Sequence, residues 1–167
     1  FGTFAISTPV PLTLLHAAGP EVRRTIALAW AESAAPADLA WIHHWLDGGE
    51  VVLSLASDGN RYWVRAPGVA DFLIEPDTAR LFASAHACLT DAATLEHVLV
   101  DQILPRVLSH FGELMVHASA LTVSGRHVLF TGQSGRGKST LAGLLQRKGH
   151  VVLSDDCVQL VANGTGF

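Results

Sequence analysis

The sequence predicts an α/β protein in which a core built on a mixed β-sheet follows a small β-rich N-terminal domain. Short β-branched and aromatic runs separated by turn residues occupy most of residues 1–89. Apolar residues then recur at three- and four-residue spacing from Leu95 to Leu108, which is typical of a helix. After residue 113, strand-like runs alternate with a glycine-rich loop and a second helical segment. We therefore expect two domains, residues 1–89 and 90–167.

Composition and charge exclude several classes of protein. With 49% hydrophobic and 16% charged residues, the 167-residue chain can bury a core and does not resemble a disordered one. The net charge of −4 gives no reason to bind nucleic acid or an anionic membrane. No apolar run approaches the roughly 20 residues that span a bilayer, and the N-terminus lacks signal-peptide features. Cys88 and Cys157 fit no metal spacing and are expected as buried thiols, so we expect a soluble, cytoplasmic protein.

The N-terminal domain is expected to be mostly strands. The expected strands are 21–29, 50–56, 61–66 and 69–76. The turn residues 57–60 between the second and third strands predict a hairpin. Residues 38–49 are expected as one or two helical turns, because Trp41 and Trp45 lie four residues apart and Gly48-Gly49 can end a helix. Residues 81–89 fit either a strand or a helix.

The second domain is expected to begin with a helix capped by Thr90 or Asp91, kinked at Pro105 and ended by Gly112. Two strands should form a hairpin across residues 124–126, and the antiparallel pairing makes the sheet mixed. The remaining expected elements are strands 114–123, 127–131, 151–154 and 157–161, and a helix 138–148 capped by Gly149.

The loop that follows residues 127–131 fits G-x-x-x-x-G-K-[ST] at every defined position. Its candidate phosphate-binding residues are Gly132, Gln133, Ser134, Gly135, Arg136, Gly137, Lys138, Ser139 and Thr140. Glycines allow backbone N–H groups to surround a phosphate, and the helix that starts there adds its positive end. Lys138 can reach the β- and γ-phosphates, and the Ser139 hydroxyl can bind Mg²⁺. A plain glycine-rich turn does not explain the Lys-Ser pair.

Asp155 and Asp156 directly follow the apolar run 151–154. If this strand runs parallel to residues 127–131, both strands end at the same edge of the sheet, beside the loop. Neighbouring side chains of an extended chain point in opposite directions, so one carboxylate can face the metal and the other an incoming hydroxyl. A simple turn is the alternative. His117 interrupts an apolar strand, where pattern alone favours a core histidine.

Residues 115–156, MVHASALTVSGRHVLFTGQSGRGKSTLAGLLQRKGHVVLSDD, resemble the catalytic core of the HPr kinase/phosphorylase family. That family has a histidine-bearing strand, a hairpin, the phosphate loop, a helix ending in Arg-x-Gly-His and an Asp-Asp pair in this order. Residues before them are more loosely similar to stand-alone HPr-kinase-like proteins, including lasso-peptide precursor kinases. The implied fold is the P-loop kinase fold shared with PEP carboxykinases.

The resemblance implies an ATP- and Mg²⁺-dependent kinase that phosphorylates a serine on a peptide or small protein. Asp155 is implied as the base that takes the hydroxyl proton, His117 as the residue that orients it, and Asp156 with Ser139 as Mg²⁺ ligands. Lys138 and the loop amides would hold the phosphates. Phosphoryl transfer depends chiefly on positioning and charge neutralisation, which these residue types can supply.

This chain departs from the family pattern at two places. Bifunctional members usually carry glutamate after the loop serine, and Thr140 stands there instead, which weakens the expectation of phosphorylase activity. The implied remaining strands, a further acidic metal ligand and a basic acceptor loop would lie beyond Phe167. We expect either a kinase fragment, inactive by itself, or a chain completed by another one. Open sheet edges would favour association into an oligomer.

Two other functions stay open on the sequence. One is a nucleotide-binding regulatory module without phosphotransfer, and the other is a small-molecule kinase or ATPase that uses the same loop. Residues 1–89 have no chemical assignment, and only their position suggests a role in recognising the acceptor or a leader peptide.

Overall fold

The computed structural model describes residues 4–8, 12, 22, 24–31, 35–89, 91–133 and 135–162. The chain divides into two compact units, Phe1–Val107 and Leu108–Phe167. This division falls inside a helix, whereas the sequence suggested a boundary before residue 90. Compactness does not establish which segment folds independently, so the two predicted domains stay a prediction.

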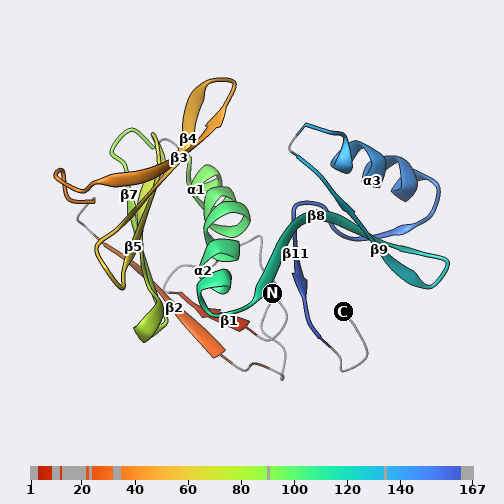
Figure 1. Ribbon diagram of the computed structural model, residues 1–167, viewed down its shortest axis with the longest axis horizontal. Helices are drawn as coiled ribbons and strands as arrows, with labels where there is room; N and C mark the ends of the chain where they lie inside the picture. The colour runs from red at the N-terminus through yellow and green to blue at the C-terminus, as the bar shows by residue number, and fades with distance from the viewer. Residues whose placement is uncertain are drawn as a thin grey trace. The chain divides into compact units, whose positions relative to one another are not determined.

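The first unit contains a seven-stranded mixed sheet with the order β1-β2-β7-β6-β5-β4-β3 (Figure 1). Its strands are β1 (Phe4–Ser7), β2 (Arg24–Trp30), β3 (Trp41–Asp47), β4 (Glu50–Ser57), β5 (Tyr62–Ala66), β6 (Ala70–Glu75) and β7 (Arg80–Ala85). The pairs β1–β2 and β2–β7 are parallel, and the other pairs in this sheet are antiparallel. The β4–β5 hairpin and the third strand of the meander are confirmed. The segment left open at 81–89 contains β7.

The helical turns predicted within residues 38–49 are wrong, because Trp41–Asp47 form strand β3. A spacing of four residues places Trp41 and Trp45 on one side of a strand as well as on one face of a helix. Gly48 and Gly49 have φ values of 58° and 90° and join the Asp47–Glu50 pair, so they form a hairpin turn and not a helix end.

Strand β6 ends before Pro76, which begins the short 3₁₀ segment η1 (Pro76–Thr78). Proline cannot donate to a strand ladder but fits the first turn of a helix, and this explains the change of conformation. Among the residues that the structure describes, no helix is both long and apolar enough to cross a membrane.

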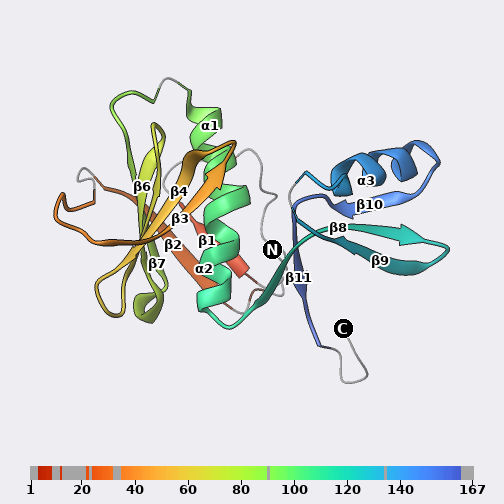
Figure 2. The same ribbon diagram turned by 45° about the horizontal axis from the view of Figure 1, so that its top comes forward.

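One continuous helical column follows the sheet and consists of α1 (Ala92–His97), the π-helical segment η2 (Val98–Ile103) and α2 (Leu104–His110) (Figure 2). Asp91 is confirmed as the N-cap, since its carboxylate accepts from the N–H of Ala93 at 3.0 Å. Thr90 lies outside the described residues. The kink predicted at Pro105 stays a prediction. Just before this residue the helix widens into π-helical spacing, and in a regular helix the proline ring would meet the carbonyl four residues earlier.

The core of the first unit lies on one face of its sheet. Alternate residues of the central strands, including Val64, Phe72 and Leu81, are fully buried. Leu99 and Ile103 of η2 are fully buried as well. Alternate residues of the strands and one face of the helix therefore contribute apolar side chains to the core.

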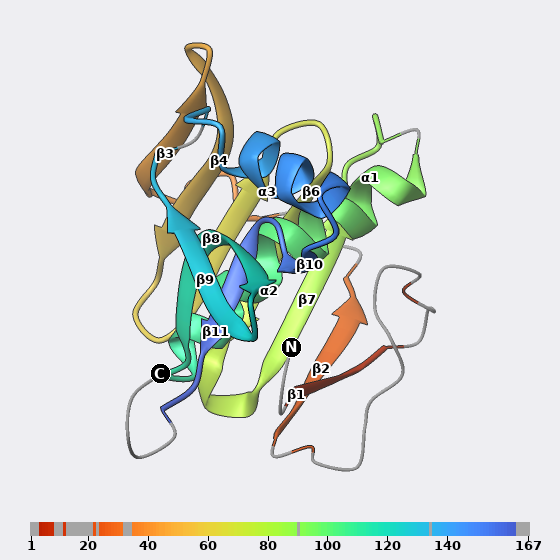
Figure 3. The ribbon, with the colours of Figure 1, turned by 90° about the vertical axis from the view of Figure 1, so that its right-hand side faces the viewer.

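The second unit contains strands β8 (Leu114–Val123), β9 (Arg126–Thr131), β10 (Val151–Ser154) and β11 (Cys157–Leu160), and helix α3 (Lys138–Arg147). Strand β8 pairs antiparallel with each of the other three. The predicted hairpin is confirmed, but its turn has two residues and not three, with Ser124 and Gly125 at φ values of 50° and 76° between the paired residues Val123 and Arg126. Helix α3 contacts β8 and β10 (Figure 3).

Mixed pairing was predicted for the second domain, but it occurs in the first unit, and the described ladders of the second unit are antiparallel. Both β9 and β10 are antiparallel to β8, so they run in the same direction on its two sides. Helix α3 ends as predicted, because Gly149 has φ 91° and its N–H bonds the carbonyl of Gln146. The His150 N–H bonds Leu145 across the same cap.

Candidate phosphate-binding loop and acidic pair

The glycine-rich loop connects the end of β9 to the start of α3. Gly135 and Gly137 have φ values of 75° and 84°, a region that other residues adopt only with strain. A Cβ atom at either position would meet no other group within 4 Å. The backbone conformation, and not lack of space, therefore explains these two glycines. Ser134 lies outside the described residues.

Lys138 is the first residue of α3 and turns back over the loop. Its Nζ donates to the carbonyl oxygens of Gly132 at 2.9 Å and Gln133 at 3.2 Å. Gly137 caps the helix without a side-chain hydrogen bond. The N–H groups of the first helical turn have no acceptor within a helix, so they are available to an anion.

The acidic pair lies between β10 and β11 along one side of β8. Ser154 pairs with Ala120 and Cys157 with His117, so Asp155 and Asp156 lie opposite Ser119 and Ala118. The N–H of Ala118 donates to the carbonyl of Asp156 at 3.1 Å, which fixes this register.

The end of β9 lies at the same level on the other side of β8, where Thr131 pairs with Ala118. Two strand spacings separate these flanking strands by about 10 Å. The start of the loop and the acidic pair therefore lie at the same level of β8, near the middle of that strand and on its two sides. The sequence argument placed both strand ends at one edge of the sheet, and whether the loop and the acidic pair form one site stays a prediction.

The two carboxylates have different partners. Asp155 Oδ1 accepts a hydrogen bond from the Ser119 hydroxyl at 2.6 Å, and Ser119 is fully buried. Asp156 Oδ1 lies 3.0 Å from Nδ1 of His117, and both of these side chains are substantially exposed. The Ser154 hydroxyl donates to the Cys157 carbonyl at 2.7 Å, a hydrogen bond that joins the residues before and after Asp155 and Asp156.

The contact of His117 differs from the role that the resemblance implied. His117 was expected to orient Asp155, but its partner in the structure is Asp156. The sequence interpretation also missed Ser119, which is the actual partner of Asp155. A signal was present, because Ser119 follows His117 by two residues in an apolar strand and therefore lies on the same side of it.

A Mg²⁺ ion at a nucleotide site needs few protein ligands. Among the described residues, no group of three or more His, Cys, Asp or Glu side chains could hold a metal ion. Mg²⁺ is commonly held by one or two carboxylates together with nucleotide phosphates and water. Asp156 and Ser139 provide oxygen atoms of that kind.

The two thiols do not match the expectation of buried cysteines. Cys88 is exposed and Cys157 is partly exposed, and neither forms a disulfide. Cys88 follows the end of β7, where its Sγ lies 3.5 Å from the Gly68 carbonyl. At Cys88 the prediction failed because a general preference for burial says little about a residue in a turn.

A buried carboxylate that the sequence interpretation missed lies in the first unit. The side chain of Asp71 is 1% exposed and accepts two hydrogen bonds from Arg65, at 2.7 and 2.9 Å. It also accepts from the Ala35 N–H at 2.7 Å and lies 3.2 Å from Nε2 of His86. Burial acts to raise the pKa of Asp71, but these hydrogen bonds and the Arg65 charge together lower it.

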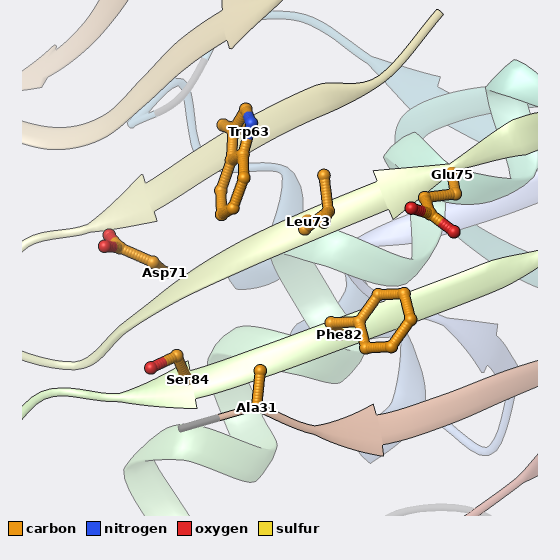
Figure 4. A pocket seen from close by; sticks show the side chains of 7 residues that line it. All are labelled: Ala31, Trp63, Asp71, Leu73, Glu75, Phe82 and Ser84. Carbon is orange, nitrogen blue, oxygen red and sulfur yellow. The ribbon is translucent and has the colours of Figure 1, made fainter. Parts of the chain in front are cut away.

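A pocket of about 270 Å³ adjoins Asp71 on the side of the sheet away from the apolar core (Figure 4). Its lining residues are Ala31, Trp63, Asp71, Leu73, Glu75, Phe82 and Ser84. The buried Nε1 of Trp63 has no hydrogen-bond partner in the described part of the chain. None of the candidate phosphate-binding or acidic residues lies in this pocket.

The strand–loop–helix segment and the adjoining carboxylates define a candidate phosphate site within an α/β protein. The chain is 43% identical over 62 residues to the HPr kinase/phosphorylase of Mycoplasmopsis pulmonis, covering 36% of this chain and 20% of that one. It is 38% identical over 71 residues to the HPr kinase/phosphorylase of Limosilactobacillus reuteri, covering 40% and 22%.

A protein of Oceanobacillus iheyensis, provisionally named a second HPr kinase/phosphorylase, is 34% identical over 80 residues, covering 48% of this chain and 24% of that protein. The predicted resemblance to the HPr kinase/phosphorylase family is confirmed over these partial stretches. The matches span less than a quarter of the length of these relatives. No model of a known protein family matches the chain, and no solved structure matches it.

Proposed function

We propose that this chain carries the nucleotide-holding part of an ATP- and Mg²⁺-dependent kinase that phosphorylates a serine on a peptide or small protein. One observation carries the proposal: Thr131, at the start of the loop, and Asp156 both lie beside Ala118 of β8, on opposite sides of that strand. The names of the relatives state kinase and phosphorylase action on HPr, and they support a kinase with a protein acceptor.

The loop would hold the phosphates of ATP. Its backbone N–H groups and the start of α3 favour an anion, and the Lys138 ammonium already lies against the loop carbonyls. Ser139 and Asp156 would hold Mg²⁺, which neutralises phosphate charge when bound. His117 contacts Asp156, so in this proposal it orients the metal ligand and not the base.

Asp155 would act as the base. Its carboxylate takes the proton of the serine hydroxyl while the serine oxygen bonds to the γ-phosphorus. The bond between that phosphorus and the β–γ bridging oxygen breaks, and ADP leaves with the electron pair. Asp155 is exposed, which leaves it open to an acceptor hydroxyl.

Phosphate transfer from radiolabelled ATP tests this function. The full-length protein would be incubated with Mg²⁺ and with HPr or serine-containing peptides as acceptors. We expect label on a serine, and a loss of about 10²- to 10⁴-fold in rate for Asp155→Asn, as for removal of a general base. Asp58→Asn is the matched control. Asp58 pairs with Arg61 in a turn of the first unit, outside the proposed site, so this variant should keep the wild-type rate.

The other candidate functions give different results in the same assay. Steady release of phosphate into water, without labelling of any acceptor, would indicate an ATPase. Tight ATP binding without turnover would indicate a regulatory module. Unchanged transfer by Asp155→Asn would overturn the assignment of the base.

A further inference from the structure

Ser119 is a polar residue in the most buried part of β8. It is 0% exposed, and its neighbours Ala118, Ala120 and Leu121 are at most 2% exposed. A hydroxyl in such surroundings is costly unless it is hydrogen-bonded. The Ser119 hydroxyl meets this requirement by donating to Asp155 at 2.6 Å.

The position of Ser119 connects the loop strand to the acidic pair. On one side of β8 it pairs with Phe130, the residue before the last one of β9. On the other side its hydroxyl contacts Asp155. Strand β8 has hydrogen-bonded neighbours on both sides, which hold the backbone of Ser119 in place. The hydrogen bond from Ser119 therefore holds the Asp155 carboxylate at a defined position relative to the loop strand β9.

The hydrogen bond uses only one oxygen of Asp155. Oδ1 accepts from Ser119, and Asp155 as a residue is exposed. A carboxylate has several acceptor positions, so the second oxygen can receive a hydroxyl proton while the first stays bound. A charge-assisted bond of this kind is short and directional, as the distance indicates.

We infer that Ser119 is a positioning residue for the proposed reaction, which sets the orientation of Asp155 toward the acceptor hydroxyl. The inference rests on the proposed kinase function and deepens it. It gives Ser119 the role toward Asp155 that the family resemblance had implied for His117. Ser119 itself does not touch the reacting atoms, because it is buried beneath the carboxylate.

The test compares Ser119→Ala, Ser119→Thr and Thr122→Val in the full-length protein. Ser119→Ala should lower kcat by about 10- to 100-fold, as for a small misplacement of a reacting group, with little change in the KM for ATP. Ser119→Thr keeps the hydroxyl and should recover most of the rate. Thr122→Val is the matched control, because it removes a hydroxyl of β8 that contacts His127 and no carboxylate, and it should leave kcat unchanged.

A double-mutant cycle separates positioning from a general structural effect. If Ser119 acts through Asp155, Ser119→Ala should have no further effect on the rate in the Asp155→Asn background. The same cycle on the unfolding midpoint should show coupling between the two residues even where turnover is too slow to measure. Multiplicative losses in rate, or wild-type kcat for Ser119→Ala, would overturn the inference while leaving the kinase function intact. Absence of transfer by the wild-type protein would overturn the proposed function and the inference with it.

Discussion

Replacing Asp71 by Asn removes the negative charge from a buried carboxylate that has four hydrogen-bonding contacts. The amide has one acceptor oxygen, and if this oxygen takes the place of Oδ1 beside Arg65 Nε and His86 Nε2, the NH₂ group faces the donors now bound to Oδ2. These donors are Arg65 Nη2 at 2.9 Å and the N–H of Ala35 at 2.7 Å. The side chain of Arg65 is 33% exposed and can be partly rehydrated, whereas Ala35 is buried.

The expected cost follows from these two contacts. Each lost contact costs about 1.5 kcal/mol at the lower end of the range for charge-assisted bonds and unpaired buried donors. The free energy of unfolding should therefore fall by about 3 kcal/mol. In a unit of about 100 residues, this lowers the melting temperature by roughly 12 °C.

Thermal unfolding followed by circular dichroism, at neutral pH, checks this value. Asp58→Asn is the matched control, because Asp58 pairs with Arg61 at an exposed site and should change the melting temperature by no more than about 2 °C. A shift of less than about 3 °C for Asp71→Asn would refute the idea that this network stabilises the sheet. Equal shifts for both variants would point to net charge instead.

Three further predictions concern pH, the loop and the core. The pKa of Asp71 is below its usual value of 3.8, so its contribution should be complete above about pH 4 and lost at lower pH, and the stability difference between wild type and Asp71→Asn should shrink there in acid titrations. Gly137→Ala requires a non-glycine residue at φ 84° and should weaken ATP binding, measured by calorimetry, by about 5- to 30-fold, which corresponds to a strain of about 1–2 kcal/mol. Gly143→Ala, inside α3 with no group near its Cβ position, is the control and should leave ATP affinity unchanged while stabilising the helix by up to about 1 kcal/mol. Leu99→Ala should lower stability to urea by about 2–5 kcal/mol, because Leu99 is fully buried, and a loss below about 1 kcal/mol would contradict its place in the core.

Turns and helix ends were predictable from the sequence because they depend on local backbone chemistry. Gly112 and Gly149 both end helices at positive φ, and the Ser124-Gly125 turn joins two strands as expected. The Asp91 cap also follows from one side chain and the next two residues.

Strand β3 was not predictable in this way. The spacing of Trp41 and Trp45 fits two periods, and Gly48-Gly49 can end a helix or turn a hairpin. Pairing with β4 decides between them, and that pairing involves a separate strand. Local pattern therefore could not resolve the choice.

The candidate site also contains local features, which the sequence can predict, and contacts between strands, which it cannot. The loop could be proposed from the sequence because its residues are consecutive, and because its chemistry depends on the φ values of its glycines and on the Lys-Ser pair. The contacts of Asp155 with Ser119 and of Asp156 with His117 cross between strands, with 36 residues separating the first pair. Sequence could propose which residues matter, but the register of β8 determines which ones meet.

Coupling between Ser139 and Asp156 in nucleotide binding tests the central claim most directly. Calorimetry would measure ATP affinity for the full-length wild type, Ser139→Ala, Asp156→Asn and the double variant, with Mg²⁺ and with EDTA. If one Mg²⁺ ion joins the loop to the acidic pair, the two substitutions should be non-additive by more than about fivefold with Mg²⁺ and additive in EDTA. Additive effects under both conditions would contradict the claim that the loop and the carboxylates act on one bound nucleotide.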